Sequence, residues 1–310
     1  MSRLFIAELR RIAARRLVRL TVALVFVGVA IGGGAVFLTT SALSQEAYEQ
    51  RVADADARRE VQQQQVEECL RAHGVDVDGK GDFSDEVGRI CLPDSDGRPD
   101  DSRVYRKRLS NLLQAVSGGL AIVGWTLGAS LIGAEFASRS MTTLLTWEPR
   151  RLRVFLTKAG ATILATGVLA FVALLAFIAA MLPAFALHGG PLRPEDPSIA
   201  TIAGIVMRGT VLCAVASGLG FSIATLGRNT AAALGAGFAY IVIFENIIGS
   251  FNEDARRWLL LGNVIVFVAG RNDAGEVFGR TVIEATLILG AVTLAFLAVA
   301  LGTFRTRDIT

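Results

Sequence analysis

The sequence predicts an all-α polytopic membrane protein, and three observations carry that prediction. Mean hydropathy is +0.50 over 310 residues, of which 52% are hydrophobic and 19% are charged. Soluble domains carry about 25% charged residues and lack uncharged apolar runs of about 18 residues or more. Six long apolar runs occur here, at residues 20–40, 111–134, 159–187, 199–226, 230–250 and 281–304. We therefore expect six transmembrane helices and exclude a plain soluble enzyme.

Basic residues near the ends of the spans set the predicted orientation. The N-terminal segment 1–19 carries six arginines against Glu8 alone, and segment 135–158 is also rich in basic residues. Arg228 and the tail 305–310 add positive charge on the same side. Because short basic loops favour the cytoplasm, both termini are expected to be cytoplasmic. A basic start before an apolar run also describes a signal peptide, but the first run is too long for one, which favours an anchored span.

Residues 41–110 predict a small extracytoplasmic domain after the first span. Acidic residues outnumber basic ones there and apolar residues are sparse, so the segment cannot bury much core by itself. The charge distribution places Cys69 and Cys91 outside the cytoplasm, where the environment is oxidising. We therefore expect a disulfide between them. Two free thiols or a metal pair is the alternative. Cys213, inside the span 199–226, is expected to stay a free, buried thiol.

Two motifs in the external segment imitate binding sites. Residues 74–81 nearly spell a phosphate-binding P-loop, but Gly81 stands where the Mg²⁺-binding hydroxyl belongs. The aspartates that begin at Asp76 resemble the start of a Ca²⁺ loop, but Val87 occupies the position of the required bidentate glutamate. We expect a solvated acidic loop here, with a weak divalent-cation site as the alternative.

The inventory of reactive groups predicts no catalytic residue and no metal site. The only histidines, His73 and His188, lack metal-binding spacing, and neither a GxSxG motif nor a usable nucleotide-binding motif occurs. The arginines form no patch interleaved with aromatic residues, so no nucleic-acid partner is expected. Active transport would therefore need energy from another chain or from an ion gradient.

Three charged residues interrupt the later spans. Arg208, Glu245 and Glu284 lie in the fourth, fifth and sixth apolar runs, and charges within a membrane are costly unless they are paired or functional. Their positions along the spans place all three in the outer part of the bilayer. We expect Arg208 to pair with at least one of the glutamates and to hold the outer helix ends together. A polar gate or cation relay is the functional alternative.

A shorter apolar run lies within the external loop 251–280. Trp258–Ala269 is too short to cross the bilayer. A seventh crossing would also move the C-terminus to the opposite side from the N-terminus. The run therefore predicts a re-entrant or interfacial helix between spans five and six.

The segment 135–158, between spans two and three, is the most informative. It begins with an acidic residue where span two ends, continues with a short amphipathic stretch and a proline, and ends with basic residues where span three begins. This pattern suits either a helix that docks on a partner or an ordinary positively charged loop. It resembles the Glu…Gly/Ser-Thr…Leu-Leu…Pro-x-Arg…Lys signature of type-2 ATP-binding cassette (ABC) transporter permeases. The matching residues are Glu135, Arg139, Ser140, Met141, Leu144, Leu145, Pro149, Arg150, Arg151 and Lys158. The usual Gly-Thr pair is replaced by Arg139–Ser140 or Ser140–Met141.

The resemblance extends to the layout of nearly the whole chain. The family has an amphipathic N-terminal helix, which residues 1–19 fit because apolar residues alternate with arginines as an interfacial helix requires. It also has six spans, a coupling helix between spans two and three, and re-entrant half-helices between spans five and six. The tail 305–310 is similar to the family's C-terminus. The long external segment 41–110 departs from the pattern.

The resemblance implies a bacterial plasma-membrane exporter subunit without its own ATP site. It would form a homodimer, or a heterodimer with a similar permease, and bind two copies of an ABC ATPase that holds the ATP and Mg²⁺. Docking on the ATPase would use the coupling segment. Its residues are Glu135, Arg139, Met141, Leu144, Leu145 and Trp147. Two other classes stay open: a gradient-driven carrier, and a non-transporting membrane sensor or assembly protein whose external domain binds a ligand.

Overall fold

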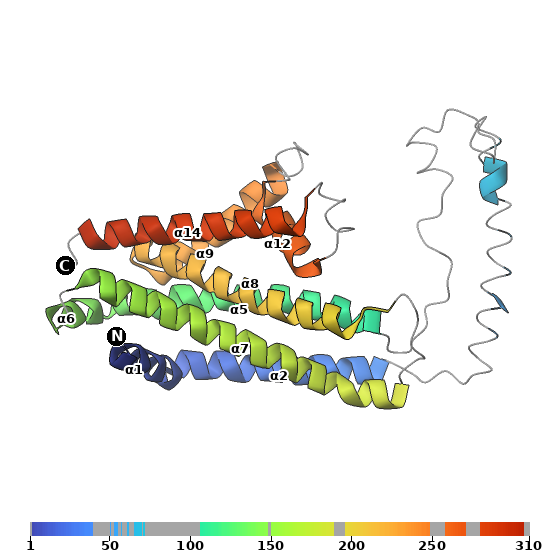
Figure 1. Cartoon of the computed structure of the whole chain (residues 1–310), viewed down its shortest axis with the longest axis horizontal. Helices are drawn as coiled ribbons and strands as arrows, with labels where there is room; N and C mark the ends of the chain where they lie inside the picture. Colours follow the sequence, from blue (N-terminus) through green and yellow to red (C-terminus); the bar gives the residue numbers. More distant parts are fainter. Residues whose placement is uncertain are drawn as a thin grey trace. The chain divides into compact units, whose positions relative to one another are not determined.

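In the computed structural model of this chain, one compact unit comprises residues 1–36, 105–183 and 191–310, and its long helices run along a common direction (Figure 1). The structure describes residues 2–39, 106–147, 150–188, 196–248, 258–270 and 280–306, together with some residues between 50 and 71. The helices in these ranges are α1 (Ser2–Ala14), α2 (Arg16–Thr39), α5 (Arg106–Ala137), α6 (Ser140–Trp147), α7 (Arg151–His188), α8 (Ile199–Gly227), α9 (Thr230–Ala239), η1 (Tyr240–Ile248), α12 (Leu260–Ala269) and α14 (Val282–Thr306). No strand occurs among the described residues.

Five of the described helices are long and apolar enough to cross a membrane: α2, α5, α7, α8 and α14. They correspond to the predicted spans one, two, three, four and six. The predicted fifth span, 230–250, differs because α9 gives way to the π-helix η1 at Tyr240. A π-helix is wider than an α-helix and is rare outside functional sites. The predicted re-entrant segment is represented by α12, a helix of 10 residues.

The N-terminal boundary also differs from the prediction. The basic segment 1–19 is not one helix, because α1 ends at Ala14 and α2 already begins at Arg16. Arg15 lies between them, and its backbone N–H donates to Ile12 O at 3.2 Å. The break lets α1 change direction and pack through Ile12 against Leu131 of α5.

Helices α5 and α8 approach each other closely, and glycines make the approach possible. Gly124 and Gly128 of α5 face the backbone carbonyls of Cys213 and Ser217, and Gly220 of α8 faces a carbonyl of α5 in return. A Cβ at any of these three positions would collide with backbone. Small residues on both surfaces therefore fix the spacing of the pair.

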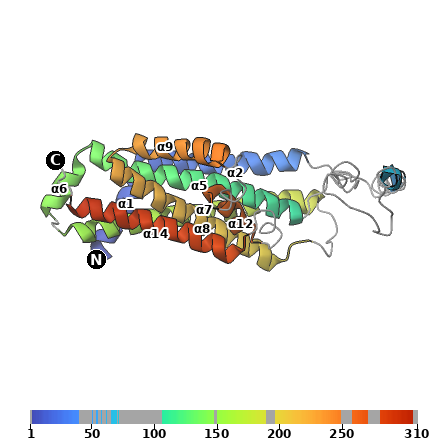
Figure 2. The same ribbon diagram turned by 90° about the horizontal axis from the view of Figure 1, so that it is seen from above.

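Helix α6 sits on a buried apolar cluster at one end of the bundle, the same end as α1 and the last turns of α14 (Figures 1 and 2). Met141 of α6 lies in this cluster with aromatic residues from three long helices, Phe155, Phe221 and Phe304. The rings of Phe155 and Phe221 meet edge to face, with centroids 5.5 Å apart. Met141 therefore joins α6 to the same buried cluster as α7, α8 and α14.

A second compact unit comprises residues 37–104 and 184–190. The described residues between 50 and 71 are helical, and Arg71 pairs with Glu67 at 3.8 Å. The P-loop-like and Ca²⁺-loop-like motifs of residues 74–87 lie outside the described residues.

Candidate functional site

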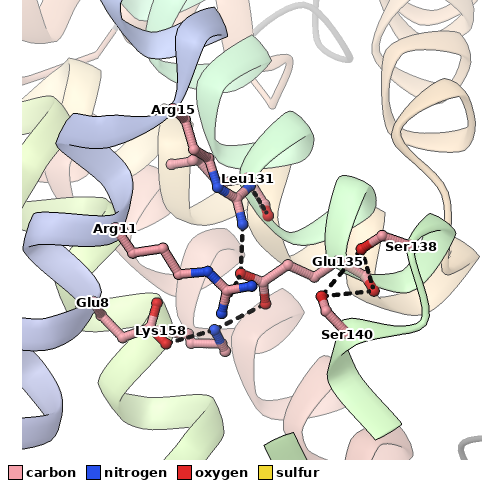
Figure 3. Close-up of polar contacts among 8 residues, drawn as sticks. All are labelled: Glu8, Arg11, Arg15, Leu131, Glu135, Ser138, Ser140 and Lys158. Carbon is pink, nitrogen blue, oxygen red and sulfur yellow. Dashed lines mark hydrogen bonds and ion pairs between the residues drawn. The ribbon is translucent and has the colours of Figure 1, made fainter. Parts of the chain in front are cut away.

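Glu135 lies two residues before the end of α5, and its side chain points into the bundle (Figure 3). Only 5% of the residue is exposed. Its Oε1 accepts a hydrogen bond from Arg15 Nη2 at 2.6 Å, and its Oε2 lies 2.8 Å from Lys158 Nζ. Each carboxylate oxygen thus has its own cation, one from the α1–α2 break and one from α7.

Lys158 connects this carboxylate to a second one. Its Nζ donates to Glu8 Oε1 of α1 at 2.8 Å, and both side chains are buried. Lys158 therefore lies between two carboxylates that are far apart in the sequence, Glu8 in α1 and Glu135 in α5. The ammonium group holds α1 and α5 to α7.

Two arginines complete the group. Arg15 also donates from Nη1 to the carbonyl of Leu131 at 2.8 Å, which fixes its guanidinium against α5. Arg11 Nη1 lies 3.6 Å from Glu135 Oε1, and its side chain is 42% exposed. We call Glu8, Arg11, Arg15, Glu135 and Lys158 the Glu135 cluster.

The Glu135 cluster is a set of paired charges in which Glu8, Glu135 and Lys158 are buried. Its two carboxylates meet three cations, and together with Leu131, Ile132, Thr162 and Phe221 the cluster lines a small cavity. Removing one partner from a buried ion pair leaves an uncompensated charge and typically costs about 3–5 kcal/mol. The arrangement therefore fixes the relative positions of α1, α5, α7 and the start of α2.

The backbone of Glu135 ties the cluster to α6. Ser140 Oγ, at the first residue of α6, donates to the Glu135 carbonyl at 3.4 Å, and Ser138 Oγ donates to the same oxygen at 3.5 Å. Arg139 between them adopts a left-handed conformation, with φ of 53°. Glycine takes that conformation most easily, so of the two possible matches to the Gly-Thr pair of the signature, Arg139–Ser140 suits the backbone better than Ser140–Met141.

The six residues predicted to couple to an ATPase fall into different environments. Glu135 is buried in the cluster, and Met141 is buried at 1% exposure in the apolar core under α6. Leu144 is partly buried against that core. Arg139 is exposed, and Trp147, at the end of α6, is 85% exposed. Leu145 lies within α6, and its side chain is outside the description.

Only part of the predicted set can therefore touch another protein directly. Arg139 and Trp147 present accessible side chains, whereas Glu135 and Met141 connect α6 to the bundle. Sequence reasoning missed the cluster partners Glu8, Arg11 and Arg15. A usable signal was present, because Glu8 is the sole acid among the arginines of residues 1–19, and a lone acid in such a setting needs a buried cation.

Two of the three charged residues of the later spans, Arg208 and Glu245, belong to a second polar region. No ion pair joins Arg208 to Glu245 or Glu284, all of which are described. Arg208 Nε instead donates to Val268 O at 3.3 Å, near the end of α12. The structure thus gives these three side chains partners other than the expected direct pair, since α12 separates the positive group from Glu245.

Glu245 binds the opposite end of α12. Its Oε1 accepts from the backbone N–H of Leu261 at 2.7 Å, and the hydroxyl of Tyr240 accepts from that of Leu260 at 2.9 Å. The N-cap residue Leu259 offers no side-chain acceptor, so η1 supplies the missing caps. A helix carries partial positive charge at its N-terminus and negative charge at its C-terminus. Glu245 and Arg208 therefore each lie at the end of α12 that their charge suits.

Gly270, which follows α12, lies directly against the Arg208 guanidinium and has φ of 63°. A Cβ on Gly270 would overlap that guanidinium. We call Arg208, Tyr240, Glu245 and Gly270 the α12 clamp. Glu284 stands apart from it, because its Oε2 accepts from Thr281 N at 3.2 Å and its own N–H donates to Thr281 Oγ1 at 3.3 Å. This reciprocal pair is a capping box at the start of α14.

The cysteines and the metal-binding groups can be placed in part. Cys69 is disulfide-bonded, and Cys91, its expected partner, lies outside the described residues. Cys213 is a free, buried thiol in α8. Within the described ranges, no group of three or more histidine, cysteine, aspartate or glutamate side chains could hold a metal ion.

One comparison with known proteins covers nearly the whole chain. A family model described as ABC-2 family transporter protein matches residues 4–309. Searches of the curated proteins and of the solved structures found no match to the chain. The matched range includes the Glu135 cluster, α6 and the α12 clamp. The chain therefore belongs to the ABC-2 family of transporter proteins and is a multi-pass membrane permease of an ABC transporter.

Proposed function

We propose that this chain is the membrane-spanning subunit of an ATP-driven exporter and that α6 is its docking element for a separate ABC ATPase. Membership of the ABC-2 family implies an ABC ATPase partner. The observation that carries the proposal is the two-sided character of α6. Trp147 is 85% exposed, while Met141 of the same short helix is completely enclosed in the bundle core.

A helix of this kind suits the transfer of motion. A partner that grips the Trp147 side moves α6, and the buried Met141 side pushes on Phe155, Phe221 and Phe304 of the long helices. The two serine hydrogen bonds to the Glu135 carbonyl carry the same motion into the Glu135 cluster. Because interlocked side chains and paired buried charges resist local deformation, α1, α5 and α7 move with α6 as a unit.

The proposed permease has six spans and works as a dimer with a separate ATPase. The five long helices and the α9–η1 segment form six spans, with both termini in the cytoplasm of a bacterial cell. Two such permeases, identical or similar, form the substrate pathway and bind two ATPase copies. ATP and Mg²⁺ bind to the ATPase, and this chain performs no chemistry of its own.

The test is co-purification of the ATPase subunit with the full-length permease in mild detergent. Trp147→Ala is expected to lower the amount of bound ATPase at least tenfold, because exposed tryptophans dominate many protein interfaces. Trp258→Ala is the matched control, since Trp258 is also largely exposed but lies beside α12. It is expected to keep the ATPase.

Two results would overturn the proposal. Equal recovery of the ATPase with Trp147→Ala and with the unmodified chain would remove α6 as the docking element. Absence of any associated ATPase, under conditions in which the permease stays folded, would favour a gradient-driven carrier or a membrane sensor.

A further inference from the structure

A strongly basic surface lies at the junction of α1 and α2. Arg10, Arg16 and Arg19 are exposed there, within ten residues of one another. In the described part of the chain these three side chains make no hydrogen bond or ion pair. The apolar side chains of Ile6 and Leu17 are about half exposed beside them. We call Ile6, Arg10, Arg16, Leu17 and Arg19 the α1–α2 arginine surface.

The only acidic residue of this segment does not neutralise the surface. Glu8 is buried on the opposite side of α1 and is bound to Lys158 at 2.8 Å. Arg11 and Arg15 face Glu135. The segment is thus sorted by charge. The Glu8 carboxylate points inward to Lys158, whereas the side chains of Arg10, Arg16 and Arg19 point outward without a partner among the described residues.

We propose that the α1–α2 arginine surface binds the headgroups of anionic phospholipids. Guanidinium groups bind phosphate oxygens in a two-pronged geometry. Basic residues on an interfacial helix that adjoins a membrane span are attracted to anionic lipids. Arg16 and Arg19 lie in the first turns of α2, whose apolar part follows directly, so these residues are at the level of the headgroups. Ile6 and Leu17 supply apolar contact with the adjoining acyl chains.

The composition of the surface argues against a second copy of the chain as its occupant. A two-fold dimer through this surface would place arginines opposite arginines, with no described carboxylate on either side to compensate. An acidic region of the ATPase is the competing occupant.

The proposal goes beyond the proposed function and does not depend on it, because lipid binding can be measured without an ATPase. The test uses the full-length chain in neutral detergent, titrated with fluorescent phosphatidylglycerol or with phosphatidylcholine that carries the same label. The unmodified chain is expected to prefer phosphatidylglycerol, and the preference is expected to fall as salt is added.

The decisive variant is Arg10→Gln/Arg16→Gln/Arg19→Gln. Its affinity for phosphatidylglycerol is expected to fall about fivefold for each arginine removed. The matched control, Arg10→Lys/Arg16→Lys/Arg19→Lys, keeps the charges and should retain most of the affinity. Folding is checked by gel filtration, and the single variant Arg10→Gln, with an expected loss of about fivefold, serves if the triple variant aggregates.

Any of three outcomes would overturn the proposal. The first is equal binding of phosphatidylglycerol by the glutamine variant and the unmodified chain, and the second is no preference of the unmodified chain for the anionic lipid. The third is unchanged lipid binding together with loss of the co-purified ATPase, which would assign the three arginines to the protein partner.

Discussion

The Glu135 cluster and the α12 clamp solve the same problem in different ways. Both place charged side chains in a largely apolar bundle. In the cluster, charges from distant segments meet one another directly, with Lys158 Nζ 2.8 Å from an oxygen of each carboxylate. In the clamp, Arg208 and Glu245 each bind backbone groups at one end of a short helix and never meet. The intervening helix dipole takes the place of the ion pair.

The difference predicts different mechanical properties. A buried cluster of direct ion pairs is intolerant of the loss of any member. A clamp made of helix-end contacts is weaker, since each such contact is worth about 0.3–2 kcal/mol, and it can open at one end while the other holds. We therefore expect the Glu135 end of the bundle to move as a rigid unit and α12 to be the more adjustable element.

The largest effect is expected from Glu135→Gln. The change leaves Lys158 with one acidic partner and Arg15 without an ionised one, and we expect it to lower the free energy of unfolding by about 3–5 kcal/mol. Thermal unfolding in detergent, followed by circular dichroism, measures the loss. Glu284→Gln is the matched control, because Glu284 is exposed and makes only local capping contacts. Similar losses for both variants would contradict the distinction between buried and local charges.

Glu8 and Lys158 test the direct pairing within the cluster. A double-mutant cycle with Glu8→Gln and Lys158→Gln is expected to give a coupling energy of about 1–3 kcal/mol, because the two side chains touch and are buried. The measurement is again the unfolding free energy of the two single variants and the double variant. Additivity of the two single changes would argue that the 2.8 Å contact contributes no specific stability.

Gly270→Ala tests the close approach within the clamp. Gly270 has φ of 63°, and the Arg208 guanidinium occupies the place of the new methyl group. We expect a loss of about 1–3 kcal/mol from backbone strain and displacement of Arg208. Gly302→Ala is the control, because that glycine is helical and has nothing within 4 Å of an added Cβ. An equal response of the two variants would mean that Arg208 does not pack on Gly270.

The smallest expected effect is the coupling between Arg208 and Glu245. If each binds its own end of α12, the changes Arg208→Gln and Glu245→Gln should be additive to within about 0.5 kcal/mol. Unfolding measurements on the two single variants and the double variant give the coupling. A value near that of the Glu8–Lys158 cycle would restore the direct ion pair expected from the sequence.

The long helices could be predicted well because the length of an apolar run is read from the sequence alone, without knowledge of tertiary contacts. The long helices at α2, α5, α7, α8 and α14 follow from runs that are long enough to cross a bilayer. The break at Arg15 and the π-helix at Tyr240 were not predictable in this way. Both depend on contacts with distant helices, Arg15 with Leu131 and Tyr240 with Leu260.

The candidate site was predictable only in its local part. Segment 135–158 was recognised from adjacent residues, whereas the partners of Glu135 lie about 120 residues earlier, at Arg15, and in α7. The partner of Arg208 differs from the expected glutamate for a related reason. From the sequence, another charged side chain is the expected partner of Arg208, whereas the end of a short helix offers backbone carbonyl groups of opposite partial charge.

The central claim is that ATPase-driven motion of α6 reaches the far part of the bundle through the Glu135 cluster. The most direct test places an environment-sensitive fluorophore on Leu261→Cys, at the exposed side of α12, in the permease–ATPase complex. We predict a fluorescence change on ATP addition in the otherwise unmodified complex. We predict a smaller change in a Glu135→Gln complex that still contains the ATPase, because only the route through the Met141 core remains, with Arg15→Gln as a second variant. An undiminished ATP-dependent change in these variants would contradict the account.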